Sequence, residues 1–169
     1  MNNLIKLQSK FPSVVLTSIQ AIEGTCGGTI QKYNTEELFK NKRVVLFSVP
    51  GAFTPTCSAQ HVPGFLKLAN DFKTQKNVQL IVCVSVNDVY VMDAWRQNQG
   101  IKNNEILMLS DPNGQLAQQT GLTLDLIDKG LGLRMKRAAF LIDDGIVKHF
   151  AVDEGKFHDT SAEEVFKAI

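Results

Sequence analysis

Two apolar runs constrain the fold of this chain more than any other feature of its sequence. Arg43–Val49 and Val78–Val86 are strand-length, rich in β-branched residues, and apolar at both alternating sets of positions. A strand that is apolar on both faces is typical of a parallel sheet covered by helices on each side. The two runs therefore predict internal strands of an α/β sheet.

Weaker patterns predict the remaining elements. The further strands expected from alternation and β-branched content are Val14–Ile19, Thr29–Tyr33, Ile106–Ser110 and a hairpin of Ala138–Ile142 with Ile146–Val152 around Asp143-Asp144-Gly145. The expected helices are Thr35–Lys40, a helix that begins at Pro55 after the cap Thr54, Tyr90–Gln99, Gln115–Thr120 and a C-terminal helix opened by Ser161–Glu164.

Three segments predict irregular structure. Thr25–Gly28 is typical of a turn, and Pro63 predicts a kink or break in the helix that begins at Pro55. Leu122–Met135 is poorly periodic and contains two glycines, so we expect a long loop there.

The order of these elements is β-α-β-α-β-α followed by β-β-α. Alternating strands and helices predict parallel strands, and the final hairpin adds antiparallel ones. This is the layout of the thioredoxin fold, with a central mixed β-sheet flanked by α-helices. The chain has 169 residues, about the length of one domain, so we expect residues 1–169 to form a single thioredoxin-like domain.

Composition excludes several classes of protein. Eighteen Lys and Arg against seventeen Asp and Glu give a net charge of +1, which argues against a nucleic-acid-binding protein. No apolar run approaches the ~20 residues that cross a bilayer, and the N-terminus lacks the apolar region of a secretory signal. We therefore expect a cytoplasmic protein, although removal of a transit peptide would leave no trace and an organelle stays possible.

The cysteines and histidines argue against a disulfide scaffold or a metal centre. The three cysteines, Cys26, Cys57 and Cys83, form no C-x-x-C pair, and the three histidines do not cluster with them. We expect neither a metal nor a cofactor.

Cys57 is the residue with the most reactive surroundings. If Thr54 caps the helix, Cys57 lies in its first turn, where free backbone N–H groups and the helix dipole favour a thiolate. The thiolate is the nucleophilic form of cysteine, so this is a candidate reactive site. The alternative is a buried cysteine on a core helix, and spacing alone does not decide between the two.

The segment around Cys57 resembles a known active site. Val49–Ser58 (VPGAFTPTCS), followed by His61–Phe65 (HVPGF), is similar to the active-site segment of the type II (peroxiredoxin-5-like) peroxiredoxins, whose motif has a P-x-x-x-T-x-x-C core. The resemblance continues in Val84–Asp88, in Met135–Arg137 and in Asp144–Lys148. It extends from about Phe11 to the C-terminus.

The resemblance implies a thiol peroxidase that reduces hydrogen peroxide and alkyl hydroperoxides. Cys57 would be the peroxidatic cysteine, which attacks the O–O bond and becomes a sulfenic acid. Thr54 would bond the sulfur and the peroxide oxygen, Pro50 would shield the sulfur from water, and Arg137 would pair with the thiolate.

Each of these residues also has a purely structural interpretation. Thr54 could serve only as a helix cap, Pro50 only as a turn residue, and Arg137 as part of a solvated basic patch. Only Arg137 matches the motif position of the family, so we expect Arg134 to shape the edge of the site. His61, four residues after Cys57, suggests a general base, but the resemblance assigns it no such role and we expect a packed or surface histidine.

The resemblance leaves the reductant open. Cys83 matches the resolving position of some plant-like members, although a cysteine inside an apolar strand is more often a small hydrophobe. Cys26, 31 residues before Cys57, resembles an upstream resolving cysteine of some fungal relatives, although a surface cysteine beside two glycines is equally ordinary. The vertebrate-type position, in Phe157–Ser161, has no cysteine. We favour direct reduction by glutathione, glutaredoxin or thioredoxin.

Two other functions compete with the peroxidase. One is a redox sensor on the same fold, in which Cys57 only relays a signal. The other is a thioredoxin-type disulfide oxidoreductase, against which the missing C-x-x-C argues. The resemblance further implies a homodimer formed through the face that carries the active-site loop, with Phe53 as a candidate contact.

Overall fold

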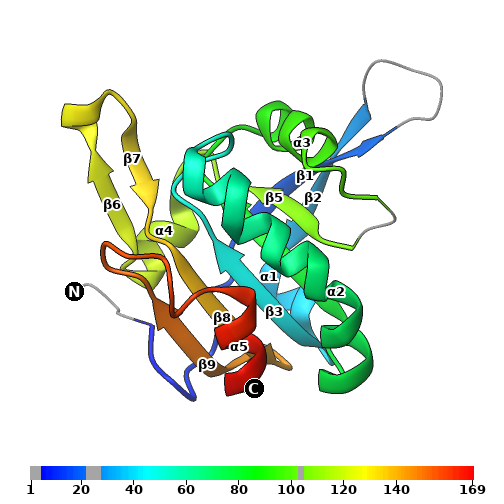
Figure 1. Ribbon diagram of the computed structural model, residues 1–169. Coiled ribbons are helices and arrows are strands. Elements are labelled where there is room, and N and C mark those ends of the chain that lie inside the picture. Colours follow the sequence, from blue (N-terminus) through cyan, green and yellow to red (C-terminus); the bar gives the residue numbers. More distant parts are fainter. Residues whose placement is uncertain (1–4, 22–27, 103–104) are drawn as a thin grey trace.

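The computed structural model describes residues 5–21, 28–102 and 105–169 of the chain. Its main sheet has seven strands in the order β2-β1-β5-β4-β3-β8-β9 (Figure 1). The strands are β1 (Val15–Ala21), β2 (Gly28–Asn34), β3 (Arg43–Ser48), β4 (Leu80–Ser85), β5 (Leu107–Ser110), β8 (Ala138–Asp143) and β9 (Ile146–Val152). The two apolar runs of the sequence are β3 and β4, two of the three central strands.

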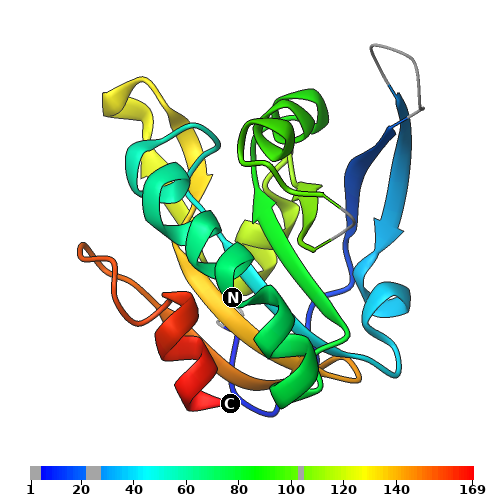
Figure 2. The same ribbon diagram turned by 45° about the vertical axis from the view of Figure 1, so that its right-hand side comes forward.

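Helices cover both faces of this sheet (Figure 2). The helices are α1 (Thr35–Phe39), α2 (Val62–Lys76), α3 (Val89–Asn98), α4 (Gln115–Thr120) and α5 (Ala162–Ala168). Helices α2, α3 and α5 pack with one face of β3, which includes Phe47, and α1 and α4 pack with the other, which includes Leu46. The mixed α/β fold expected from the sequence is confirmed.

Strand direction places three strand ends at one edge of the sheet. Strands β3, β4 and β5 are parallel, while β8 runs antiparallel to β3. Their carboxyl ends, at Ser48, Ser85 and Ser110, therefore meet at a common edge, which in open α/β sheets is where ligands bind.

Short-range signals correctly predicted the β8–β9 turn and the start of α5. Asp144 and Gly145 join β8 to β9 with φ values of 47° and 76°, the left-handed pair that a two-residue hairpin needs. Ser161 caps α5 by accepting a hydrogen bond from the N–H of Glu164. The predicted turn Thr25–Gly28 falls largely on residues outside the described part of the chain.

The prediction of a long loop over Leu122–Met135 is wrong. The segment forms a two-stranded hairpin of β6 (Thr123–Leu126) and β7 (Gly132–Met135), joined by a 3₁₀ turn at Ile127–Lys129. Its two glycines adopt left-handed φ values near 70° and close the turn, so they mark a hairpin rather than a loop. Only four residues alternate on each side, which is too short a pattern to show clearly in the sequence.

Pro63 does not break its helix. The chain is helical from Pro55 to Lys76, and the irregularity is a π-helical turn, Cys57–His61, that precedes the proline. Proline lacks an N–H and crowds the carbonyl four residues earlier. A wider π turn relieves that conflict, and such turns are frequent at functional sites.

Within the described ranges, none of the helices has the length and apolar character required to cross a bilayer.

Candidate active site

Cys57 opens the π-helical turn and is completely buried. The loop Pro50–Thr54 carries the chain to it from the carboxyl end of β3. The backbone carbonyl of Thr54 accepts a hydrogen bond from the N–H of Ser58 at 3.0 Å, which begins the helix where the sequence predicted. The thiol therefore lies at a helix start, in the buried interior of the molecule.

Arg137 is the direct partner of this thiol. Its Nη2 donates to Sγ of Cys57 at 3.2 Å. Arg137 immediately precedes β8, and the antiparallel register sets Ala138 opposite Ser48, the last residue of β3. The pairing of β3 with β8 thus fixes the arginine beside the loop that leads to Cys57.

His61 is a second partner of Arg137, on the turn that begins at Cys57. Nη1 of Arg137 lies 2.9 Å from Nδ1 of His61, and Nε2 of His61 lies 3.0 Å from the carbonyl oxygen of Thr160. Because a guanidinium only donates and a carbonyl only accepts, these contacts define a neutral imidazole with its proton on Nε2. Burial, and then the charge of Arg137, lowers the pKa of His61 to about 3, so it stays neutral near pH 7.

The segment between β9 and α5 braces this arrangement. The carboxylate of Asp153 accepts hydrogen bonds from the backbone N–H groups of His158 and Asp159 and from the hydroxyl of Thr160. The ring of Phe157 lies 5.5 Å from the Arg137 guanidinium. Arg137 therefore contacts three side chains, those of Cys57, His61 and Phe157.

The loop before Cys57 is held at the end of β4. Oδ1 of Asn87 accepts from the N–H of Ala52 at 2.8 Å and from the hydroxyl of Ser85 at 2.7 Å. The Thr54 hydroxyl donates to the carbonyl of Gly51 at 2.8 Å. Among the described contacts, this hydroxyl bonds neither the sulfur nor a helical N–H, so Thr54 does not provide the side-chain cap that the sequence predicted.

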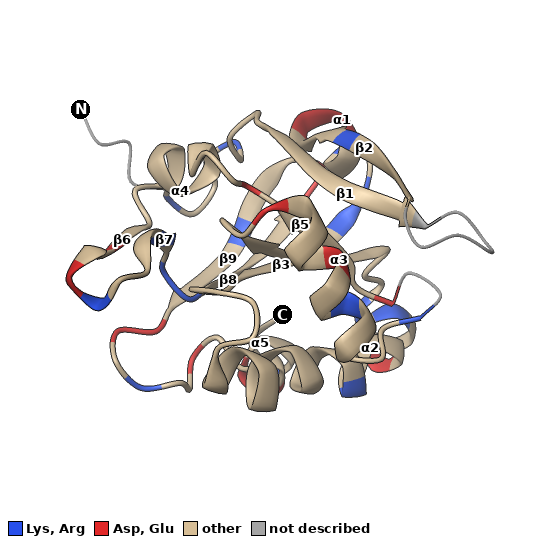
Figure 3. Cartoon of the chain, turned by 90° about the horizontal axis from the view of Figure 1, so that it is seen from above, with Lys and Arg blue, Asp and Glu red and all other residues tan. Residues whose placement is uncertain are grey.

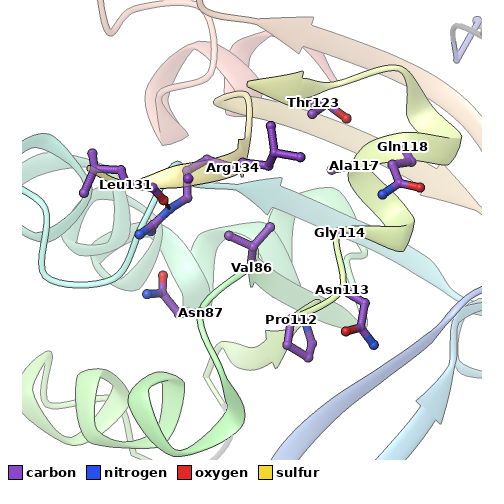
Figure 4. A pocket seen from close by; sticks show the side chains of 12 residues that line it. Val86, Asn87, Pro112, Asn113, Gly114, Ala117, Gln118, Thr123, Leu131 and Arg134 are labelled. Atoms are coloured by element: carbon purple, nitrogen blue, oxygen red, sulfur yellow. Dashed lines mark hydrogen bonds between the residues drawn. The ribbon is translucent and has the colours of Figure 1, made fainter. Parts of the chain in front are cut away.

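Arg134 lies at the edge of the site and contacts backbone. Its Nη1 donates to the carbonyl of Pro50 at 3.2 Å, and its Nε donates to the carbonyl of Leu131. Figure 4 shows its side chain reaching from β7 toward Asn87, across a cavity of about 370 Å³. A Cβ added at Gly51 would lie 2.7 Å from this guanidinium, so the glycine lets Arg134 approach the loop.

Of the other two cysteines, the structure describes only Cys83. Cys83 lies within β4, is fully buried, and belongs to the same apolar cluster as Cys57. Burial, followed by the nearby charge of Cys57, raises the pKa of the Cys83 thiol well above its ordinary value. Both thiols are free. Cys26 lies outside the described residues.

The structure thus places Cys57, Arg137, Thr54 and Pro50 around one strand end, with Cys57 and Arg137 in direct contact. Reasoning from the sequence missed the contact between His61 and Arg137, and the contribution of Asp153. Only the spacing of His61 from Cys57 drew attention to that residue, and no sequence pattern connected Asp153 to the site.

Comparisons with known proteins identify the family of this chain. Residues 6–166 match the sequence model of the Redoxin family. Peroxiredoxin-2E-2, chloroplastic, of Oryza sativa is 42% identical over 168 residues, which cover 98% of this chain and 72% of the relative. Peroxiredoxin-2E, chloroplastic, of Arabidopsis thaliana is 47% identical over 145 residues, which cover 84% of this chain but only 61% of the relative.

The chain also has a fold similar to that of a solved structure. Reduced Prx3 of Vibrio vulnificus, crystallised in complex with H₂O₂, is 40% identical, with a TM-score of 0.88 and coverage of 98% of this chain and 99% of that one. The match is thus to a thioredoxin-like fold of the Redoxin class. The chain belongs to the peroxiredoxin family.

Proposed function

We propose that this protein is a thiol peroxidase whose peroxidatic cysteine is Cys57. The contact of 3.2 Å between Nη2 of Arg137 and Sγ of Cys57 is the observation that supports this most strongly. A guanidinium beside a buried thiol stabilises the thiolate, which is the form that attacks a peroxide. The complex of the Vibrio vulnificus relative with H₂O₂ supports the same substrate here.

The proposed reaction has a simple balance. The Cys57 thiolate attacks the terminal oxygen of ROOH, so an S–O bond forms and the O–O bond breaks. The sulfur is oxidised by two electrons to a sulfenic acid, and the departing RO⁻ takes up a proton to become ROH. Negative charge spreads along S···O···O, where the Arg137 guanidinium stabilises it. Pro50 keeps water from the sulfur, and the Thr54 hydroxyl would need to turn from Gly51 to contact the peroxide.

His61 acts in this proposal as a positioning residue for Arg137. The variant His61→Asn keeps an acceptor at the position of Nδ1, whereas His61→Gln places its amide near the position of Nε2 and leaves Arg137 without that acceptor. An unpaired buried donor costs about 1–3 kcal/mol. We therefore expect His61→Gln to lower kcat/KM for H₂O₂ about tenfold and His61→Asn to lower it less than about threefold.

The ultraviolet absorbance of the Cys57 thiolate at neutral pH separates this role from simple packing. It should fall in His61→Gln and persist in His61→Asn. Equal losses in both variants would mean that His61 only fills space.

For regeneration we propose direct reduction by an external thiol: glutathione, glutaredoxin or thioredoxin. Two thiols reduce the sulfenic acid to the thiol, giving one disulfide and one water. Cys83 is a weak candidate for an internal partner because it is buried and its raised pKa keeps it protonated, whereas the attacking species is a thiolate. Cys26 stays an open candidate.

Serine variants test this route. We expect Cys83→Ser and Cys26→Ser each to retain most of the activity supported by glutathione and glutaredoxin. A non-reducing gel after one equivalent of H₂O₂ should show no covalent dimer and no faster-migrating monomer. A dimer that disappears in Cys26→Ser, or a compact monomer that disappears in Cys83→Ser, would identify an internal thiol as the resolving group.

Three further properties belong to the proposal. Residues 1–169 form one thioredoxin-like domain. The protein forms a homodimer through the face of the active-site loop, where Phe53 is 52% exposed beside Trp95. The cytoplasm remains our proposed compartment, although two similar plant relatives are named as chloroplastic and support an organelle as the alternative.

Repeated turnover tests the function as a whole. With excess thiol, a peroxidase consumes many equivalents of H₂O₂ per subunit, whereas a redox sensor stops after about one. Running the assay separately with glutathione plus glutaredoxin and with thioredoxin identifies the donor. A halt after one equivalent with every donor would contradict the proposed function.

A further inference from the structure

The cleft beside Arg137 is much larger than hydrogen peroxide requires. It has a volume of about 440 Å³, and residues of the β6–β7 hairpin and of the segment that joins β9 to α5 line it. Cavities of this size hold organic ligands. Pro50, Thr56 and Arg137 are part of its lining, so the cleft adjoins the arginine that contacts the Cys57 thiol.

One part of the lining is apolar. Leu124 and Leu126 enter from β6, and Phe157 enters from the opposite segment. The Phe157 ring lies 5.5 Å from the guanidinium of Arg137, so the apolar part approaches the reacting centre. A hydrocarbon chain placed here would leave water as it binds.

The remainder of the lining carries more cations than carboxylates. It contains four cationic side chains and two carboxylates, which leaves a formal net charge of +2 against +1 for the whole chain. The cations are Lys129, Lys136, Arg137 and Lys156, and the carboxylates are Asp153 and Glu154. The cleft therefore concentrates positive charge in a protein of nearly balanced composition.

Both carboxylates already have partners. Asp153 accepts hydrogen bonds from its own segment, and Glu154 pairs with Lys136 at 3.3 Å. Among the described residues, Lys129 and Lys156 take part in no ion pair, and both are exposed. Figure 3 shows basic residues beside acidic ones on the hairpin and on the segment after β9. Two lysines are therefore available to an anion.

We propose that this cleft binds organic hydroperoxides that have an apolar chain ending in a carboxylate. The proposal rests on the proposed function and names its substrate class. The hydroperoxyl group lies at Cys57 and Arg137, the chain lies along Leu124, Leu126 and Phe157, and the carboxylate pairs with Lys129 and Lys156. The chemistry is unchanged: the thiolate takes the terminal oxygen, and the chain leaves as the corresponding alcohol.

A matched pair of substrates tests this directly. A fatty-acid hydroperoxide and its methyl ester, used as monomers in solution, differ only in the carboxylate. The oxidation step can be followed in a single turnover by the fluorescence of Trp95, because this sole tryptophan donates to Ser58, the neighbour of Cys57. We expect the wild type to react about fivefold faster with the acid than with the ester, a size typical of two exposed ion pairs, and we expect salt to reduce this preference.

The variant Lys129→Gln/Lys156→Gln should lose the preference while its rate with H₂O₂ stays within about twofold. Lys32→Gln is the matched control, because Lys32 is an exposed lysine of β2, at the opposite edge of the sheet from β9; it should retain the preference.

Equal wild-type rates for acid and ester would overturn the proposal, and so would a double variant that keeps the preference for the acid. A double variant that slows only the re-reduction by glutathione would also overturn it, because the cleft would then be the site of the reductant. A wild-type protein that does not turn over H₂O₂ would instead refute the proposed function itself.

Discussion

Cys57→Ser is expected to lower peroxide turnover by at least about 10³-fold, because a serine hydroxyl is barely ionised at neutral pH and is a poor nucleophile. The measurement is the initial rate of H₂O₂ consumption with excess thiol. Oxygen is smaller and more polar than sulfur, so the serine at this fully buried position requires a check that the variant folds.

Cys83→Ser is the matched control, since Cys83 is equally buried in the same cluster. It should retain most of the activity if it folds, and a thermal melt of both variants checks folding. Turnover above a few per cent in Cys57→Ser would move the chemistry to another cysteine.

Arg137→Met is expected to have the second largest effect, a loss of about 10²–10³-fold in kcat/KM for H₂O₂, as when one preorganised donor is removed from a developing anion. Methionine keeps much of the side-chain volume but removes the charge and the donor that lies 3.2 Å from the Cys57 sulfur. The fraction of Cys57 present as thiolate at neutral pH should fall with the rate.

Arg134→Met provides the comparison, because Arg134 bonds backbone carbonyls at Pro50 and Leu131 rather than the sulfur. We expect less than about a tenfold loss. Equal losses at Arg134 and Arg137 would show that both arginines act on the reacting atoms, or that the two changes only disturb the loop.

The parts of this fold that the sequence predicted are those set by short-range signals. The apolar runs that became β3 and β4, the turn at Asp144 and Gly145, and the start of the helix at Pro55 all depend on neighbouring residues. The β6–β7 hairpin was missed because it is short and because its glycines are equally compatible with a loop. The π turn at Cys57–His61 was missed because Pro63 only predicts some irregularity, not its form.

In the site too, features set by neighbouring residues were predicted and contacts between distant residues were not. The motif around Cys57 is local, and the resemblance it carries led to Arg137. The bond from Arg137 to His61 joins residues 76 positions apart, and it depends on the register of β8 against β3. No pattern along the chain encodes that register, so His61 could not be connected to Arg137 before the structure.

Labelling of the sulfenic acid identifies which cysteine the peroxide oxidises. The reduced protein is mixed with one equivalent of H₂O₂ in the presence of dimedone, which traps sulfenic acids, and the labelled cysteine is identified by mass spectrometry of its peptides. We expect near-stoichiometric labelling of Cys57 and almost none at Cys83 or Cys26. Labelling concentrated on either of those cysteines, with Cys57 still reduced, would contradict it.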